Sequence, residues 1–331
     1  MNASMGELVR VLLSLGAIAL LLLGIEAGLR TLGLHQPICY VADAATGYRL
    51  KPHQQLNHRG KRFETNAVSM RSGEVQQRSA HTVRILLLGD SVANGGLAID
   101  QTETISALLQ RQLTVQITAR ASNQATTPLK SIPSADVLNA SASSWGPQNE
   151  WGYLRTFGTF DAQIVLLLLN TDDLFAGAPT SQPVGSYAYP THPPKWAIAR
   201  LWHRWQHQTQ YSDPASDSAS ISASDPVAEN LRTIHDMHQF TQAENATLIL
   251  LLTPLRRELA PGGQQDYEHL ARIHLRDFVE ANNITWIDFL NTWKDEPDAN
   301  RFYRDSIHLS LDGNNSVSTA IASLIPTILS D

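Results

Sequence analysis

Three long apolar runs place the strongest constraint on the fold of this chain. They lie at residues 83–88, 164–169 and 247–252. A strand that is apolar at almost every position is buried on both faces, as in a parallel sheet that helices cover on each side. Weaker patterns at residues 136–139 and 285–288 predict two further strands.

Helical patterns lie between these runs. Apolar residues recur at helical spacing in residues 103–113, 226–242, 270–279 and 317–329, and Asp225 is a plausible N-cap for the second of these helices. Strands that alternate with helices predict an α/β fold with a mainly parallel sheet. Because ligands bind beyond the carboxyl ends of such strands, we expect the chemistry in the loops that follow them.

One segment near the N-terminus is long and apolar enough to cross a membrane. Residues 11–25 carry no charge, and the helix extends to residues 8–29 when the Arg10 side chain reaches the interface. That is about the twenty residues that a spanning helix needs. A cleaved signal peptide is the alternative, but Gly24 and Ala27 make a poor cleavage site. We therefore predict an uncleaved signal anchor. The mean hydropathy of −0.18 separately excludes a polytopic membrane protein.

The orientation of this anchor follows less directly from charge. Arg10 precedes the apolar segment, and Arg30 and Arg49 follow it within the range where the positive-inside rule is strong. Taken literally, this bias places the C-terminal part in the cytoplasm. A long folded domain is translocated largely regardless of charge, however. We predict a single-pass inner (cytoplasmic) membrane protein with an extracytoplasmic, periplasmic domain.

We expect the chain to have three parts. Residues 1–34 form the anchor, residues 35–80 form a polar juxtamembrane stalk, and residues 81–331 form one catalytic domain. Residues 212–226 are rich in Ser, Ala and Asp and predict a flexible surface insert. Residues 178–196 are rich in proline and form either a lid over a site or a solvent loop whose tryptophans pack on the sheet.

The overall composition excludes several classes of protein. With 25 basic against 31 acidic side chains, the net charge of −6 argues against a general nucleic-acid binder. The single cysteine, Cys39, excludes an intramolecular disulfide framework and a thiolate zinc cluster. Neither a Walker motif nor G-x-G-x-x-G occurs, so we expect no nucleotide and no other cofactor.

The first strand is followed by a candidate nucleophile. Ser91 directly follows Gly89 and Asp90, although Ala93 prevents a match to the G-x-S-x-G elbow. Asp305 and His308 come 217 residues later, three positions apart, so the carboxylate can orient the imidazole toward a serine. Each block alone is more often a helix cap, but together and in this order they indicate a catalytic triad.

With these motifs the chain resembles the SGNH/GDSL-type serine hydrolases over roughly residues 83–330. The resemblance implies a flavodoxin-like, three-layer α/β/α sandwich in which Ser91 is the nucleophile, His308 the general base and Asp305 its orienting residue. The anchor and the lead-in at residues 47–52 are similar to a membrane-tethered bacterial subgroup, some of whose members are associated with surface polysaccharides.

The second block of that family resembles residues 139–146. There the family supplies an oxyanion-hole N–H from a glycine. In this chain Ser144 falls in that register, and Gly146 lies two residues further on. The resemblance therefore implies that the N–H groups of Ser91 and of the loop from Ser144 to Gly146 stabilise the oxyanion.

The third block of the family departs from the pattern. G-x-N-D appears here as Asn170-Thr171-Asp172-Asp173, so Asp172 stands where the family has an asparagine that donates its amide. An ionised carboxylate cannot donate and repels the developing charge, and losing one donor costs about 10²–10³ in rate. Four alternatives stay open: Asp172 is protonated, Asn170 reaches the site instead, only backbone groups donate, or catalysis is weak or absent.

Two histidine pairs were considered as metal ligands. His203 and His207 share one helix face, and His235 and His238 share another, but no H-E-x-x-H pattern accompanies the first pair. Exposed histidines on polar helices are the better interpretation, so we expect no metal.

The predicted function is a serine esterase that acts on an acylated small molecule or on O-acyl groups of envelope or exported polysaccharide. Water as the acceptor gives an esterase, and a sugar hydroxyl gives an O-acyltransferase with the same triad. Arg256 and Arg257 either contact an anionic substrate or belong to a solvated loop. The rival function, favoured by Asp172, is a catalytically weak glycan-binding scaffold.

Overall fold

The computed structural model describes residues 5–124, 134–207 and 225–328. Its main sheet has five strands in the order β6-β5-β7-β8-β9, and every neighbouring pair is parallel. The strand bounds are β5 Thr82–Gly89, β6 Ser134–Ser141, β7 Ile164–Asn170, β8 Thr247–Thr253 and β9 Thr285–Asp288. Numbered within the sheet, this is the flavodoxin-like order 2-1-3-4-5.

The apolar runs have the physical cause that their sequence predicts. Along β5, Leu86 and Leu88 point into one hydrophobic core, whereas Ile85 and Leu87 point into a second core on the other face. All four side chains are 0% exposed. Successive residues of a strand face opposite sides, so a strand between two cores must be apolar at both.

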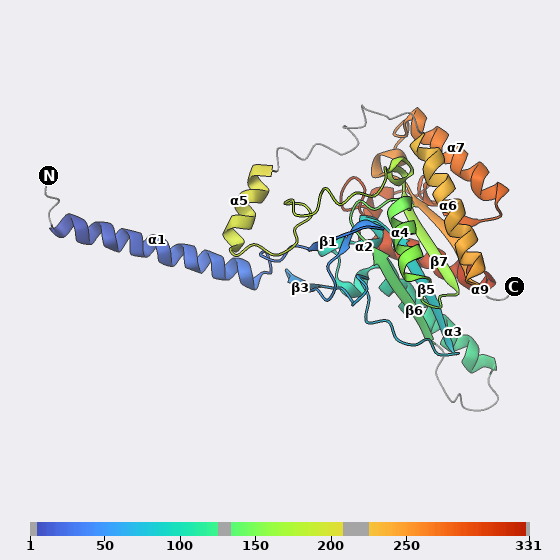
Figure 1. Ribbon diagram of the computed structural model, residues 1–331, viewed down its shortest axis with the longest axis horizontal. Helices are drawn as coiled ribbons and strands as arrows, with labels where there is room; N and C mark the ends of the chain where they lie inside the picture. Colours follow the sequence, from blue (N-terminus) through green and yellow to red (C-terminus); the bar gives the residue numbers. More distant parts are fainter. Residues whose placement is uncertain (1–4, 125–133, 208–224, 329–331) are drawn as a thin grey trace.

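Helices cover both faces of the sheet and make the three layers (Figure 1). The core on one side is closed by α4 Pro147–Phe157, α6 Pro226–Ala243 and α7 Asp266–Ala281. The core on the other side is closed by α3 Ile105–Gln124, α8 Phe289–Trp293 and α9 Leu311–Ile328. The predicted α/β/α sandwich with a parallel sheet is confirmed.

Individual helices differ from their predicted bounds, and the largest difference is that α3 continues to Gln124, eleven residues beyond its predicted end at residue 113. Asp225 caps α6 as expected, because its carboxylate accepts from the N–H of Val227 at 3.0 Å. The helices α7 and α9 begin several residues before their apolar pattern does, since their first turns consist mostly of polar residues and glycine. Residues 212–224 of the predicted insert lie outside the described residues.

Residues 35–80 do not form the predicted stalk. They contain two antiparallel hairpins, one of β1 Tyr40–Asp43 and β2 Gly47–Leu50 and one of β3 Gln55–His58 and β4 Lys61–Glu64. Four of their side chains are at most 4% exposed and belong to the core that contains Leu86 and Leu88 of β5, namely Tyr48, Leu50, Phe63 and Met70. The folded unit therefore begins well before residue 81.

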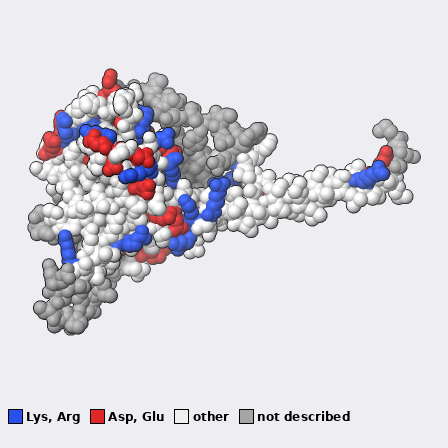
Figure 2. Space-filling view, turned by 180° about the vertical axis from the view of Figure 1, so that it is seen from behind, with Lys and Arg blue, Asp and Glu red and all other residues white. Residues whose placement is uncertain are grey.

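The N-terminal helix α1 Met5–Thr31 projects from this unit (Figure 1). It is long and apolar enough to cross a membrane, a property that it shares with signal sequences. Figure 2 shows charged groups at the free end of α1 and at its base, but not on the part of the helix between them. At the base, α1 contacts the amphipathic helix α5 Ala197–His207.

Short helical turns complete the described chain. They are α2 Ser91–Asn94 and the 3-10 turns η1 Gly96–Ala98, η2 Gln101–Glu103, η3 Thr171–Phe175, η5 Arg256–Leu259 and η6 Ala299–Phe302. Three of these turns, α2, η3 and η5, follow the carboxyl ends of β5, β7 and β8. The edge of the sheet where ligands are expected is therefore built from tight turns.

Candidate active site

Ser91 lies at the topological switch point of the sheet. It follows β5, which is hydrogen-bonded to β6 on one side and to β7 on the other. The chain runs outward from β5 in both directions, so the helices after β5 and β6 lie on different faces and leave a crevice above the strand ends. The sequence predicted the functional loops at this edge.

The turn that presents Ser91 depends on Gly89. A Cβ atom at this position would lie 2.7 Å from the Ala93 Cβ and 2.8 Å from the Leu168 carbonyl oxygen, which is closer than real side chains approach. The next residue, Asp90, is the N-cap of α2, and its Oδ1 accepts from the N–H of Val92 at 2.7 Å. Glycine thus lets α2 start tightly against the sheet, and Asp90 fixes its first turn.

The structure brings Ser91, His308 and Asp305 together. The His308 Nε2 atom lies 3.0 Å from the Ser91 Oγ, and its Nδ1 atom lies 2.9 Å and 3.0 Å from the two carboxylate oxygens of Asp305. With Nδ1 protonated and bonded to Asp305, Nε2 carries the lone pair that faces the serine hydroxyl. This is the geometry that a serine nucleophile with its base requires.

Asp305 is held as an anion. Partial burial raises its pKa, but hydrogen bonds from the His308 ring and from the backbone N–H groups of His308 and Ile307 outweigh this effect. The net result is a pKa of Asp305 below its ordinary range. A permanently charged acceptor at Nδ1 also favours the imidazolium that forms when His308 takes up a proton.

Distant parts of the chain hold the loop that carries Asp305 and His308. The Arg304 guanidinium donates to the Gly95 carbonyl oxygen at 2.9 Å, directly after α2. The Tyr303 hydroxyl donates to the Pro254 carbonyl oxygen, and the Arg256 N–H donates to the Ser306 carbonyl oxygen at 2.9 Å. Sequence reasoning missed Arg304, although its place beside Asp305 was a signal.

The second candidate block offers one donor that is already engaged and one that is exposed. The Gly146 N–H donates to the Asn149 Oδ1 at 3.0 Å, which closes the first turn of α4. Ser144 is exposed and has a positive φ of 56°. The Gly146 N–H is therefore already engaged, and Ser144 is the remaining candidate donor of this block.

In the third block, the candidate donors of Asn170 and Asp172 are also engaged in hydrogen bonds within the protein. The Asn170 amide donates to the Asp90 Oδ2 at 3.1 Å and to the Asp173 Oδ2 at 2.8 Å, so both of its hydrogens are engaged. The Asp172 N–H donates to the Asn170 Oδ1 at 2.8 Å, and the Asp172 residue is half-buried at the start of η3. Asn170 thus ties the ends of β5 and β7 together.

A cluster of tyrosines borders the second block. The Tyr48 hydroxyl donates to the Ser143 carbonyl oxygen at 2.7 Å, and the Tyr40 hydroxyl lies 2.9 Å from the Ser143 Oγ. The Tyr189 ring packs against both of the other rings, with centroid distances of 5.0 Å and 4.9 Å. Burial raises the pKa of Tyr48, so its hydroxyl stays protonated and able to donate.

Three carboxyl groups near the candidate site, those of Asp90, Glu150 and Asp173, are buried and close enough to influence one another. Burial raises the pKa of Asp90, Glu150 and Asp173, and the charge of Asp90 adds to the effect at Glu150 and Asp173. Neither carboxyl oxygen of Glu150 has a hydrogen-bond partner among the described residues. Ionising Glu150 here costs free energy, because burial keeps solvent from its carboxyl group and no described residue donates a hydrogen bond to it.

Three of the side chains that the sequence offers as metal ligands or anion contacts, those of His235, His238 and Arg257, have partners within the protein. His235 bonds to Asn282 and Gln239, and His238 bonds to Gln242. Among the described residues, no group of three or more His, Cys, Asp and Glu side chains is placed to hold a metal. His203 and His207 lie on α5, and their side chains are outside the description. Arg257 is paired with Glu268, whereas the Arg256 side chain is exposed.

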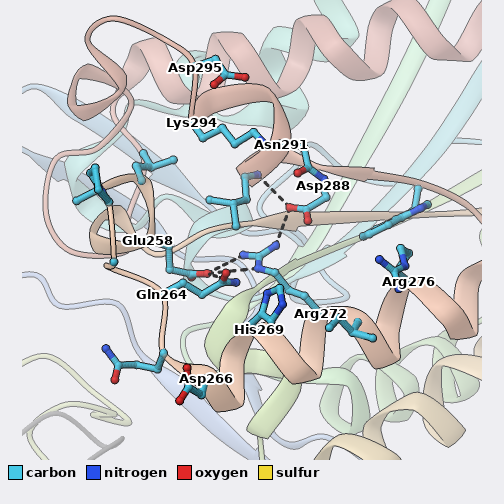
Figure 3. A pocket seen from close by; sticks show the side chains of 18 residues that line it. Glu258, Gln264, Asp266, His269, Arg272, Arg276, Asp288, Asn291, Lys294 and Asp295 are labelled. Atoms are coloured by element: carbon cyan, nitrogen blue, oxygen red, sulfur yellow. Dashed lines mark hydrogen bonds and ion pairs between the residues drawn. The ribbon is translucent and has the colours of Figure 1, made fainter.

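A hollow of about 730 Å³ lies away from the triad, between η5, α7 and α8 (Figure 3). Its central cation, Arg272, is bonded to Glu258 and to Asp288, which are both buried or nearly so. The charge of Arg272 is therefore neutralised within the protein. None of the triad residues lines this hollow.

Comparisons with known proteins find similarity at the level of structure only. No model of a known protein family matches the chain, and no curated protein matches it. Similar solved structures include LAE5, an α/β hydrolase enzyme from the metagenome of Lake Arreo (13% identity, 73% of this chain and 94% of that chain, TM-score 0.46). A lipase/acylhydrolase from Enterococcus faecalis (15%, 73% and 95%, TM-score 0.46) is similar. So is a catalytic mutant of Axe2, an acetylxylan esterase from Geobacillus stearothermophilus (12%, 73% and 92%, TM-score 0.42).

Proposed function

We propose that the protein is a serine esterase of the SGNH/GDSL kind, in which Ser91, His308 and Asp305 form the catalytic triad. The observation that carries this proposal is the unbroken chain of hydrogen-bond distances from Asp305 through the His308 ring to the Ser91 Oγ. It stands at the switch point of a flavodoxin-like sheet, where a substrate has access to the serine.

In the acylation step the Ser91 Oγ attacks the ester carbonyl carbon while His308 Nε2 takes the hydroxyl proton. The carbonyl oxygen becomes an oxyanion, which the N–H groups of Ser91 and of the loop at Ser144 stabilise. The ester bond then breaks, and His308 returns the proton to the departing alcohol. The product is an acyl-Ser91 ester, with Asp305 stabilising the transient imidazolium.

Deacylation repeats these steps with a new nucleophile. Water gives up a proton to His308 and attacks the acyl carbon, and the proton then returns to the Ser91 Oγ as the acid leaves. When a sugar hydroxyl takes the place of water, the acyl group is transferred instead of hydrolysed. The triad is common to both reactions, so an acceptor added to the assay distinguishes the esterase from the O-acyltransferase.

We further propose that α1 anchors the protein in the inner membrane, that the domain is extracytoplasmic, and that the substrate is an acylated small molecule or an O-acylated envelope or exported polysaccharide. The apolar length of α1 supports the anchor. A reporter that is active only in the periplasm, fused to the C-terminus, tests the topology, and a fusion that is expressed in full but has no reporter activity would overturn it.

The enzyme is tested with the full chain in detergent micelles and p-nitrophenyl acetate as substrate. We expect turnover that Ser91→Ala abolishes, and fluorophosphonate labelling that mass spectrometry assigns to Ser91. Ser323→Ala, on the exposed side of α9, is the matched control and should keep full activity. No Ser91-dependent turnover together with no labelling of Ser91 would sink the proposal.

The rival function is favoured by one observation, the carboxylate of Asp172 in place of an amide donor. A glycan-binding scaffold of this fold needs no oxyanion hole. It would bind acylated oligosaccharide equally well with Ser91→Ala and would show no burst of product. Retained binding without turnover in the wild-type chain decides for this rival.

A further inference from the structure

The helix α5 and the residue before it expose large apolar side chains to solvent. Trp196, which directly precedes α5, is 56% exposed, and Leu201 and Trp202 within it are 39% and 56% exposed. Leu201 and Trp202 lie one turn beyond Ile198, so they belong to one stripe of the helix. Exposed apolar groups that are contiguous in this way mark an interaction site, because water solvates them poorly. The alternative that tryptophans of the 178–196 insert pack on the sheet does not apply to Trp196.

The start of α5 is bound to the end of α1. The two carboxylate oxygens of Glu26 accept from the N–H groups of Ala197 at 2.9 Å and of Ile198 at 3.0 Å. Glu26 is 5% exposed and therefore serves as the cap that α5 does not supply itself. The Arg200 guanidinium also donates to the Leu34 carbonyl oxygen at 2.9 Å, just beyond α1. Figure 1 shows α5 beside the base of α1.

These contacts set the depth of α5 relative to a bilayer. Apart from Arg10, residues 8–25 of α1 carry no charge, and this stretch is about 27 Å long at the rise of an α-helix. The hydrocarbon core of a bilayer is about 30 Å thick. Glu26 follows this stretch directly, so it lies where the hydrocarbon ends. The first turn of α5, which is bonded to Glu26, must then lie at the level of the headgroups.

The composition of α5 and of the residues before it suits that level. Tryptophan is enriched where a membrane meets water, since its ring is apolar and its N–H is polar. Residues 176–207 contain no Asp or Glu, while Lys195 and Arg200 supply positive charge. Lys195 is exposed, and anionic lipid headgroups attract basic residues close to the surface. An amphipathic helix with basic and tryptophan side chains is typical of interfacial membrane binding.

We propose that α5 lies in the headgroup region of the same bilayer that α1 spans, with Trp196, Leu201 and Trp202 inserted toward the acyl chains. This inference rests on α1 being a retained anchor, and it explains the contacts of Glu26, which cleavage near Ala27 would remove. Two attachment points fix the orientation of the domain as well as its location. The segment that leads into α5 includes Tyr189, whose ring packs on Tyr40 and Tyr48, so this segment connects α5 with the tyrosines that border the candidate site.

The test uses nitroxide spin labels on the full chain in nanodiscs of phosphatidylcholine and phosphatidylglycerol in equal amounts. The label is attached at Leu201→Cys, and Leu270→Cys is the matched control, since Leu270 is 52% exposed and its helix α7 lies on the side of the domain remote from α1 (Figure 1). The native Cys39 is buried, and labelling of the wild-type chain measures its background. Circular dichroism melting verifies that each variant is folded.

We expect the label at position 201 to collide with oxygen, which dissolves in lipid, several-fold more than with a water-soluble nickel chelate. The label at position 270 should show the reverse preference. Equal exposure of both labels to the nickel chelate overturns the inference, and shielding of position 201 from both reagents overturns it in favour of a protein partner. A third label at Leu15→Cys separates the causes of failure. If position 15 is in lipid and position 201 is not, the anchor stands and only the interfacial role of α5 falls.

Discussion

The hydroxyl of Tyr48 donates a 2.7 Å hydrogen bond to the carbonyl oxygen of Ser143, across 95 residues of sequence. Tyr48 belongs to the hairpin β1–β2, and Ser143 belongs to the loop that follows β6 and contains Ser144. The Trp145 indole N–H returns a bond to the Tyr48 carbonyl oxygen at 2.9 Å. A segment N-terminal to the sheet thus braces a loop in which we place one of the oxyanion donors.

Removing this brace should slow catalysis without unfolding the protein. We expect Tyr48→Phe to lower kcat on p-nitrophenyl acetate about 10-fold with little change in KM, because a loosened donor stabilises the transition state less. Tyr153→Phe is the matched control, since the Tyr153 hydroxyl is bonded to the Val68 carbonyl oxygen and not to this loop, and phenylalanine keeps the ring that packs on Trp145. Both variants should lose about 1 kcal/mol of stability. Equal effects of the two variants on kcat would contradict a role for Tyr48 in the site.

Asp305 is expected to act through His308 and not only through packing. Asp305→Asn should lower kcat/KM about 10³–10⁴-fold, because the amide no longer favours the Nδ1–H tautomer and cannot stabilise the imidazolium. The depressed pKa of Asp305 keeps the wild-type carboxylate ionised as the pH falls through 5. Loss of activity in that range therefore cannot come from protonation of Asp305. Asp295→Asn, at an exposed acid, should leave kcat/KM unchanged, and a fall of less than 10-fold for Asp305→Asn would argue against the triad.

Substitution of Asp172 tests whether the carboxylate that replaces an asparagine in the third block faces the oxyanion. We expect Asp172→Asn to raise kcat at least about 10-fold, because it replaces a charge that repels the oxyanion with an amide that donates to it. Stopped-flow measurement of the acylation burst separates this effect from deacylation. Asp173→Asn is no substitute, since the Asp173 carboxyl accepts from the Asn170 N–H at 2.8 Å and is part of the turn. An unchanged kcat for Asp172→Asn places this carboxylate away from the oxyanion.

Glu150 should make the protein less stable as the pH rises. Its pKa is raised in the folded state, so the folded protein holds a proton that the unfolded chain releases above a pH of about 4.3. By linkage, stability is greatest below that pH and falls as the pH rises toward the folded pKa. We expect Glu150→Gln to raise the Tm by at least about 2 °C at pH 8, the effect of about 1 kcal/mol, and by nothing at pH 4. The exposed Glu280→Gln serves as the control, and identical pH profiles for both variants would refute the argument.

Much of the fold was predictable because its signals are local. The apolar runs at β5, β7 and β8 reflect burial on two faces, and Asp225 before Pro226 marks the start of α6 within a residue. The order of Ser91 before Asp305 and His308 also follows from sequence, because each lies in a short block. Their mutual distances depend on the parallel sheet, which the alternation of elements implies.

The hairpins were not predictable for a physical reason. Their strands have four residues each, which is too short for an alternation pattern to stand out. The hairpin β3–β4 is held by contacts outside its own sequence, such as those of the buried Arg71, which lies over the Phe63 ring and donates to the Arg62 carbonyl oxygen. Arg71 also donates to the Asn94, Gly96 and Ile99 carbonyl oxygens, which ties the hairpin to the segment after β5. The cap that Glu26 gives to α5 likewise joins residues 171 positions apart, and no local pattern announces it.

The same separation along the chain has a consequence for biosynthesis. His308 follows Ser91 by 217 residues, and only the last helix comes after it. At a synthesis rate of about 5–20 residues per second, the ribosome takes roughly 10–40 s to pass from the serine to its base. During that interval the nascent chain carries a hydroxyl no more reactive than any other serine. The ester-cleaving function that we propose would therefore begin only after His308 has been synthesised and has folded against Ser91, and a product terminated before His308 would lack its general base.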